Sequence, residues 1–196
     1  CVAGSFQPGG GWDNASTPLY DDGTRGDLVA GDGTYSLDYA IAKTAGYYEW
    51  KIFSCGTWNG YPGEGNNKWL YTTTNPETVK FMFNTGTVDD GYQPATNLAN
   101  VIDSASELTH TWTAVGDWQG WNQNSVTTTM KMVAPGLQAV TSPVPIAGAY
   151  QFKVTETGSW AHQFGPDGRS IDSGNYNFQT YSADQPVAFY VDPVRG

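Results

Sequence analysis

Charged side chains are scarce in this sequence, and positive ones are the scarcest. Only 14% of the 196 residues are charged, and 19 acidic residues against 9 lysines and arginines give a formal net charge of −10. Nucleic acids and anionic membrane surfaces are bound by clustered cations, so both classes of partner are excluded. The sequence also lacks the run of about 18 apolar residues that a membrane-spanning helix needs.

Groups for hydrolytic chemistry are equally sparse. The two histidines, His110 and His162, stand apart in the sequence, and no Gly-x-Ser-x-Gly nucleophile motif accompanies them. Glycoside hydrolysis needs two facing carboxylates about 5 to 10 Å apart, and no Asp or Glu pair recurs between the two halves of the chain. The sequence therefore predicts no catalysis.

Cysteine is limited to Cys1 and Cys55, which allow a single disulfide. We expect an oxidised pair that joins the first strand to the central strand, as is common in extracellular proteins. Two alternatives remain open: Cys55 packs as a small apolar residue beside a free Cys1, or Cys1 is the acylated first residue of a bacterial lipoprotein. A Cα separation above about 7 Å would exclude the bond within one chain and favour a bridge between chains.

Glycine and aromatic residues are abundant, and they fall in a repeat. Residues 46–58, GYYEWKIFSCGTW, return as residues 148–160, GAYQFKVTETGSW. In each copy an alternating aromatic and polar run, typical of a half-buried strand, leads to a Gly turn that ends on a Trp. The similarity extends outward, pairing residues 3–13 with 115–122 and residues 79–84 with 187–192.

Each copy thus contains an opening, a central and a closing strand in about 90 to 100 residues, the size of one β-sandwich. Gly, Thr, Tyr and Trp outnumber strong helix formers, which indicates an all-β protein. We predict two tandem immunoglobulin-like antiparallel β-sandwich domains, residues 1–90 and 109–196, joined by a linker at residues 91–108.

A block dense in Asp-Gly dipeptides, residues 19–35, precedes the second strand of the first copy. Such dipeptides suit tight turns, and we interpret the block as a turn-rich connection. The alternative is a calcium site, because carboxylates are the hard oxygen ligands that Ca²⁺ takes. Its ligands would be Asp21, Asp22, Asp27 and Asp32. Their spacing is not that of an EF-hand, and the second copy lacks the block, so no cofactor is expected.

The Trp at the end of each Gly turn is the candidate binding residue. A pyranose ring stacks its apolar face on Trp or Tyr, and its hydroxyls bond to amides and carboxylates. The alternative is that these rings cap the core, as large aromatic residues commonly do. The candidate residues are Trp58, Asn59, Tyr61 and Trp69 in the first copy and Trp160, His162, Gln163 and Asn175 in the second. We assign Trp12, Trp50, Trp118 and Phe152 to the core.

The segments that carry the repeat resemble the small immunoglobulin-like modules that accompany bacterial pullulanases, and are broadly similar to starch-binding sandwich families. In the first copy these segments are VAGSFQ at 2–7, WDN at 12–14, DGTY at 32–35, GYYEWK at 46–51, GTW at 56–58 and VKF at 79–81. In the second copy they are GSW at 158–160, FGPDG at 164–168, GN at 174–175 and residues 187–192. The second copy departs from the pattern by lacking the Asp-Gly block.

The resemblance implies a non-catalytic bacterial module pair, extracellular or at the cell surface, whose partner is a polysaccharide of the α-glucan type. By position, it implies that Trp58 and Trp160 hold the sugar. The rival hypothesis is a structural subunit of a filament or surface layer, in which strand edges pair between copies to form a homo-oligomer.

Overall fold

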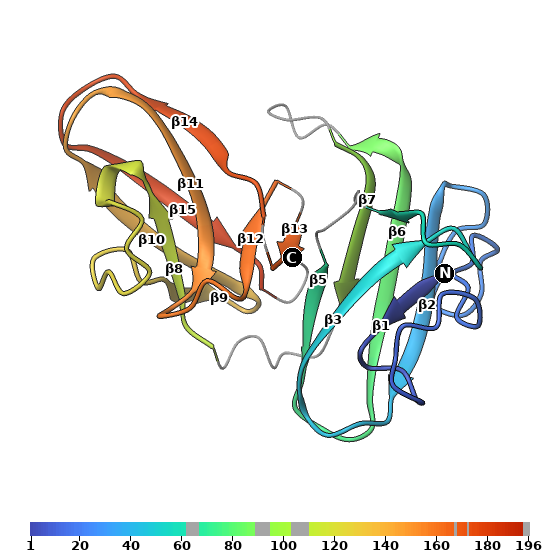
Figure 1. Ribbon diagram of the computed structural model, residues 1–196. Helices are drawn as coiled ribbons and strands as arrows, with labels where there is room; N and C mark the ends of the chain where they lie inside the picture. Colours follow the sequence, from blue (N-terminus) through green and yellow to red (C-terminus); the bar gives the residue numbers. More distant parts are fainter. Residues whose placement is uncertain (62–66, 89–94, 103–109, 167, 172, 194–196) are drawn as a thin grey trace. The chain divides into compact units, whose positions relative to one another are not determined.

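The computed structural model describes residues 1–61, 67–88, 95–102, 110–166, 168–171 and 173–193 (Figure 1). As predicted, the protein is all-β, with antiparallel sheets and a short 3-10 helix. It divides into two compact units, unit 1 at residues 1–106 and unit 2 at residues 107–194. None of the described helical residues forms a helix long and apolar enough to cross a membrane.

Unit 1, coloured blue to green in Figure 1, consists of two sheets. In one sheet, β3 pairs with β1, β4 and β5, and in the other the order is β2-β6-β7. The strands are β1 (Val2–Gly4), β2 (Thr34–Ile41), β3 (Gly46–Phe53), β4 (Gly60–Tyr61), β5 (Lys68–Thr72), β6 (Glu77–Val88) and β7 (Ala95–Ile102).

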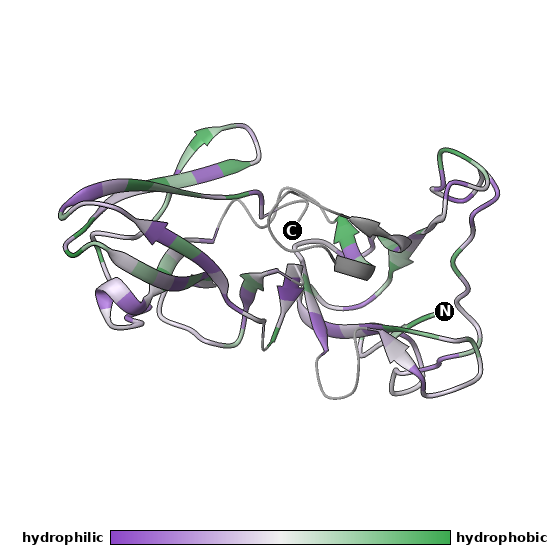
Figure 2. Cartoon of the chain, turned by 90° about the horizontal axis from the view of Figure 1, so that it is seen from above, coloured by the Kyte–Doolittle hydropathy of each residue, from purple (hydrophilic) through white to green (hydrophobic). Residues whose placement is uncertain are grey.

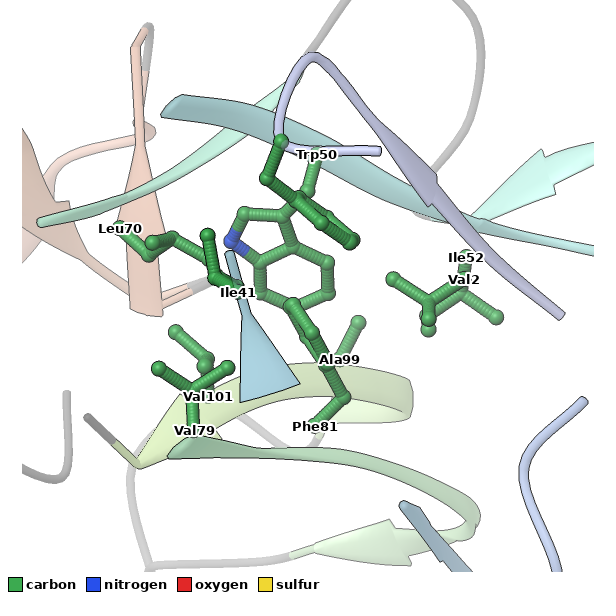
Figure 3. Packing of buried hydrophobic residues seen from close by; sticks show 10 residues of the cluster. Val2, Ile41, Trp50, Ile52, Leu70, Val79, Phe81, Ala99 and Val101 are labelled. Carbon is green, nitrogen blue, oxygen red and sulfur yellow. The ribbon is translucent and has the colours of Figure 1, made fainter. Parts of the chain in front are cut away.

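The core of unit 1 is built around Trp50, which is fully buried, as predicted. Figure 3 shows its indole surrounded by aliphatic side chains and by Phe81. The Phe81 ring meets Trp50 edge to face with centroids 5.0 Å apart, and stacks on Phe6 at 5.1 Å. The indole N–H donates to the carbonyl of Trp69 at 3.1 Å, so burial of the ring leaves no unpaired donor.

Strand β7 lies inside the stretch predicted as a linker. It pairs with β6 from Lys80 opposite Ile102 onward, and Ala99 and Val101 belong to the core of unit 1. The first unit therefore extends past residue 90. The rest of the expected linker, residues 91–94 and 103–108, lies outside the described residues.

Unit 2, coloured yellow to red in Figure 1, also contains two sheets. In one, β11 pairs with β8, β12 and β14, and β12 continues to β13; in the other the order is β15-β10-β9. The strands are β8 (Trp112–Gly116), β9 (Lys131–Ala134), β10 (Leu137–Val144), β11 (Gly148–Glu156), β12 (Gln163–Gly165), β13 (Gly168–Ser170), β14 (Tyr176–Thr180) and β15 (Gln185–Val191), with the 3-10 helix η2 (Asp117–Gln119) after β8. Figure 2 shows that hydrophilic and hydrophobic residues follow one another at short intervals along the strands.

The remaining residues assigned to the core behave differently from one another. Trp118 stacks on Phe189 with centroids 4.8 Å apart and planes at 5°, and Phe152 meets Phe189 edge to face at 4.9 Å. Both therefore pack in the interior of unit 2, although each keeps some exposure. Trp12 is also only partly buried, and its φ of 62° lies in the left-handed region, as does the 56° of Trp121.

Corresponding hydrogen bonds hold the opening segment of each unit. The Gln7 amide group donates to the carbonyls of Val2 and Asp13 at 3.3 and 3.0 Å. Gln119 does the same in unit 2, donating to the carbonyls of Ala114 and Asn122 at 3.1 Å each. One side chain thus ties the strand to the following loop in both units.

The disulfide forms between Cys1 and Cys55 within the chain, with the Cα atoms 4.9 Å apart. The prediction is confirmed, and a thiol in this bond is not free for lipoprotein acylation. Because β1 pairs with β3, the two cysteines lie at adjoining ends of these strands. The bond therefore closes a loop across 54 residues of sequence beside the Gly turn.

Candidate functional site

Trp58 lies at the tip of a tight turn that follows β3. Gly56 has a φ of 75°, in the left-handed region that glycine adopts without strain. The turn is closed by Ser54, whose N–H donates to the carbonyl of Asn59 at 3.0 Å. Trp58 is 66% exposed, and its ring meets Phe53 edge to face with centroids 5.3 Å apart. One face of the indole is therefore available to solvent while an edge contact holds the ring.

Trp160 occupies the corresponding turn after β11. Gly158 has a φ of 84°, and the N–H of Glu156 donates to the carbonyl of His162 at 3.0 Å. This turn is one residue longer than the first, because Ala161 stands between the Trp and the closing residue. Trp160 is 38% exposed, so it presents less of its ring than Trp58 does.

The loop before each turn supports it from the side. Gly56 donates its N–H to the carbonyl of Asn14 at 2.9 Å, and the Asn14 amide group donates to the carbonyl of Thr57 at 2.6 Å. In unit 2, Gly158 donates to the carbonyl of Gln123 at 3.1 Å. Sequence reasoning missed these supporting residues, because only the folded chain brings the two loops together.

The residues expected beside Trp58 do not all join it. Asn59 follows it in the same exposed turn, with its N–H bound to the Thr57 hydroxyl at 3.2 Å. Tyr61 is on β4, where its ring packs against Phe83 with the centroids 5.2 Å apart. Trp69 is only 1% exposed, so its proposed role as a stacking face is wrong. Lys68, Trp69 and Leu70 are all buried on β5, so the burial of this ring does not follow an alternating pattern that the sequence could indicate.

Two of the residues expected beside Trp160, His162 and Gln163, form hydrogen bonds to residues of the turn. Gln163 is 5% exposed, and its amide group donates to the carbonyls of Trp160 at 2.6 Å and Ile171 at 3.1 Å. It therefore positions the turn that carries Trp160. Asn175 donates to the side chain of Gln151 at 3.1 Å, which places it with the exposed amides of β11 and β14.

His162 belongs to a cluster with the second histidine. Its Nδ1 lies 2.6 Å from one oxygen of Glu156, while Nδ1 of His110 lies 2.9 Å from the other oxygen. All three side chains are at most 20% exposed. The cluster fixes the carboxylate of the residue that begins the Trp160 turn.

Three of the four calcium candidates come together. Asp21, Asp27 and Asp32 place one carboxylate oxygen each within 4.8 Å of one another. The oxygens already serve the loop, since Asp21 accepts the N–H groups of Gly31 at 2.7 Å and Gly33 at 3.1 Å. These bonds are those of the turn-rich connection that the sequence predicts.

Asp22 stays outside this group. It lies 3.5 Å from Arg25 and accepts hydrogen bonds from the N–H and the hydroxyl of Thr24. The Thr24 hydroxyl, assisted by the Arg25 charge, lowers the pKa of the Asp22 carboxyl. An ion pair already neutralises this carboxylate, so the calcium interpretation of Asp22 has no support in the geometry.

The fold and these turns define a class of protein: a sandwich-like β module that presents one indole to solvent in each unit. Residues 104–195 match the family described as the pullulanase X25 domain, a stretch that includes all of unit 2. The resemblance to the accessory modules of bacterial pullulanases is therefore confirmed.

Curated relatives extend the similarity across both units. An amylopullulanase of Thermoanaerobacterium saccharolyticum is 29% identical over 170 residues, 83% of this chain and 12% of the relative. Amylopullulanases of Thermoanaerobacter thermohydrosulfuricus and Thermoanaerobacterium thermosulfurigenes are each 28% identical over 171 residues, covering 84% and 83% of this chain and 11% and 9% of the relatives. The chain thus spans about a tenth of the length of these relatives.

Proposed function

We propose that this chain is a non-catalytic, extracellular module pair that binds α-glucan, such as starch, glycogen or pullulan, through Trp58 and Trp160. The observation that carries the proposal is their shared placement. Each indole ends a Gly turn after the central strand of its unit, and each is exposed while Trp50 and Trp112 are fully buried. A turn that served folding alone would bury its ring.

The chemistry of the turns suits a sugar. The apolar face of a pyranose stacks on an indole, and its hydroxyls bond to polar groups at the ring's edge. The Trp58 turn offers the Asn59 side chain and backbone groups, and no charged side chain lies within residues 54–59. A neutral polyol fits such a surface better than an ionic ligand does.

The names of the relatives support α-glucan as the class of ligand. The relatives are named amylopullulanases, a name that refers to starch-type glucan and pullulan. This chain corresponds to a small part of them, in keeping with an accessory role. The disulfide between Cys1 and Cys55 supports an extracellular location, since such bonds persist in oxidising compartments.

The carboxylates support a role without catalysis. Glu156 is engaged by two histidines, and the acidic residues of the 21–33 loop accept backbone N–H groups. General acid and base work needs carboxyl groups that are free to face a substrate. Binding is therefore the activity that the exposed indoles are suited to perform.

The test is retention on insoluble starch, with affinity electrophoresis in soluble glycogen and pullulan. Replacing both Trp58 and Trp160 by Ala should abolish retention, because a stacked aromatic anchor typically contributes about 1–3 kcal/mol. The matched control replaces Tyr181 and Tyr190 by Ala, two rings that are 80% and 60% exposed outside the Gly turns. The control should bind as the parent does, and both proteins should keep the parent's melting temperature.

The opposite results are equally clear. If the parent protein passes through starch unretained and electron microscopy shows it in filaments, the structural-subunit hypothesis replaces this one. If the double Trp variant unfolds while the double Tyr variant does not, the indoles serve folding.

A further inference from the structure

A second indole of unit 2, that of Trp121, has no role in the proposed function or in the comparisons. Trp121 follows the 3-10 helix η2 and is partly buried. Its φ of 56° lies in the left-handed region, which a bulky side chain adopts only against steric resistance. Glycine takes this conformation without strain, so a Trp at this position indicates that the ring itself has a role.

Two hydrogen bonds fix this indole in place. The backbone N–H of Trp121 donates to the carbonyl of Gly116 at 3.0 Å, and the indole N–H donates to one oxygen of Asp117 at 2.9 Å. The other oxygen of Asp117 accepts the N–H of Gln151 on β11 at 2.8 Å. The ring is therefore tied to the central strand of unit 2, which is the strand that leads to the Trp160 turn.

The loop that starts at Trp121 runs to the Trp160 turn. Gln123 accepts the N–H of Gly158, the glycine of that turn, at 3.1 Å. The side-chain oxygen of Asn124 also lies against this glycine, since it would be 3.3 Å from a Cβ placed there. Two peptide steps of about 3.8 Å on each side of the hydrogen bond put the Cα atoms of Trp121 and Trp160 within about 22 Å of each other. One oligosaccharide chain can span that distance.

The stretch between the two indoles offers unused hydrogen-bond donors. Residues 121–125, WNQNS, carry no charge, and Asn122 and Asn124 are exposed. The Asn122 side-chain oxygen accepts the N–H of Asn124 at 3.0 Å. The NH₂ groups of both side chains have no partner among the residues that the structure describes. Such amides can bond sugar hydroxyls, and an uncharged loop suits a neutral ligand.

The corresponding loop of unit 1 does not offer these donors. Its indole, Trp12, has a similar φ of 62°. Asp13 and Ala15 stand where unit 2 has Asn122 and Asn124, and the same hydrogen bond of 3.0 Å joins each pair. A carboxylate has no N–H to donate, and Ala has no polar side chain. The combination of an oriented indole with free amides beside it therefore belongs to unit 2.

We infer that residues 121–124 extend the α-glucan site of unit 2, so that one glucan chain lies on both Trp160 and Trp121. Each indole stacks on the face of one sugar, and the amides between the indoles bond the hydroxyls of the intervening units. Unit 2 therefore recognises a longer stretch of glucan than unit 1, whose site is centred on Trp58 alone. This inference rests on the proposed function and specifies the length of chain that each unit recognises.

The experiment measures the affinities of maltotriose and maltoheptaose by isothermal titration calorimetry. Trp58→Ala isolates the site of unit 2, and Trp160→Ala isolates that of unit 1. The unit 2 site should bind maltoheptaose more than about tenfold more tightly than maltotriose, because a second aromatic anchor commonly contributes that much. The unit 1 site should show only the few-fold advantage that a longer chain gains from having more units to bind.

Two variants test the loop within the Trp58→Ala protein. Trp121→Gly removes the ring and adopts the left-handed φ without strain, so the melting temperature should stay near that of the parent. It should remove most of the preference for maltoheptaose, and Asn124→Ala, which deletes one free amide, should reduce that preference severalfold. The matched control is Trp12→Gly within the Trp160→Ala protein. It removes the corresponding ring from unit 1 and should leave both affinities unchanged.

The outcomes that overturn this inference differ from failure of the proposed function. If the two units show the same preference, or if both loop variants keep the preference of unit 2, the glucan does not reach Trp121 although the module binds it. If Trp121→Gly melts well below the parent while Asn124→Ala keeps the preference, the indole serves folding. If the parent binds neither sugar, the proposed function itself fails, and this inference fails with it.

Discussion

Trp58 stands edge-on to Phe53, with the two ring planes at 86° and the centroids 5.3 Å apart. The buried ring comes from the end of β3 and the exposed ring from the turn that follows it, so the core itself orients the exposed indole. In unit 2 the residue corresponding to Phe53 is Thr155, which offers no such ring. The two indoles therefore differ in their support as well as in their exposure.

This difference predicts unequal contributions to binding. Trp58→Ala should reduce starch affinity by about 1–3 kcal/mol, and Trp160→Ala by less, because less of its ring can contact a ligand. Deleting Ala161 should bring the second turn to the length of the first and make the contributions of Trp58 and Trp160 to starch affinity more nearly equal. Affinity electrophoresis of the single variants measures this order, and equal losses from the two would contradict it.

Loss of the disulfide should destabilise unit 1 without affecting unit 2. Closing a loop across 54 residues stabilises by about 4 kcal/mol on the chain-entropy model. Cys1→Ser and Cys55→Ser should each lower the free energy of unfolding of unit 1 by a similar amount, and reduction of the parent should do the same. Calorimetry that resolves two transitions is the measurement, and reductant should leave the Cys55→Ser variant unchanged.

Gln7 and Gln119 offer a matched pair of variants. The Gln7 side chain accepts the N–H groups of Gly4 and Asp13 at 3.1 and 2.8 Å, so Gln7→Leu leaves two backbone donors without their acceptor. We expect a loss of about 1–3 kcal/mol in unit 1, since unpaired polar groups near the core are costly. Gln119→Leu should act on unit 2 alone, which urea unfolding followed by hydrogen exchange can separate. A loss shared by both units would contradict independent folding of the two segments.

Acid should weaken the loop that supports the Trp58 turn. A side-chain hydrogen bond with Ser16, and then one from the backbone of Ala15, lower the pKa of Asp13 below its ordinary value of 3.8. A carboxyl with a depressed pKa contributes stability that is present above pH 3.8 and is lost as the pH falls through the lower, folded-state value. Asp13→Asn should remove this contribution at neutral pH and flatten the acid limb of the unfolding curve. An acid limb unchanged in the variant would assign the effect to other groups.

The sequence predicted the opening, central and closing strands of each copy because alternation and Gly turns are local signals. GYYEWKIF and GAYQFKVT read as strands, and both form them as β3 and as most of β11. Alternation does not say which sheet a face meets, so the burial of Trp69 could not be predicted. β7 was assigned to the linker because ATNLANVI has no counterpart in the second copy that would mark it as part of the repeated unit.

The two Trp residues of the candidate site could be predicted from the sequence, but the residues that contact their turns could not. The repeated Gly-x-Trp turn is visible in the sequence, and both indoles prove to be exposed. Asn14 and Phe53 reach the turn only through tertiary contacts across tens of residues.

Each unit has a three-stranded sheet, β2-β6-β7 in unit 1 and β15-β10-β9 in unit 2, and its third strand pairs with a different one of the two corresponding strands. In unit 1, β7 covers the outer edge of β6, whereas in unit 2 β9 covers β10 and leaves the outer edge of β15 unpaired among the described strands. On β2 the outer edge is already bridged, at Ser36 to Tyr20. A filament needs two open strand edges per subunit, one for each neighbouring copy. When the β15 edges of two copies pair with each other, neither copy has that edge left for a third copy, so the assembly is closed. Strand addition at this edge would therefore stop at dimers, with Pro186 limiting the backbone donors available to the pair.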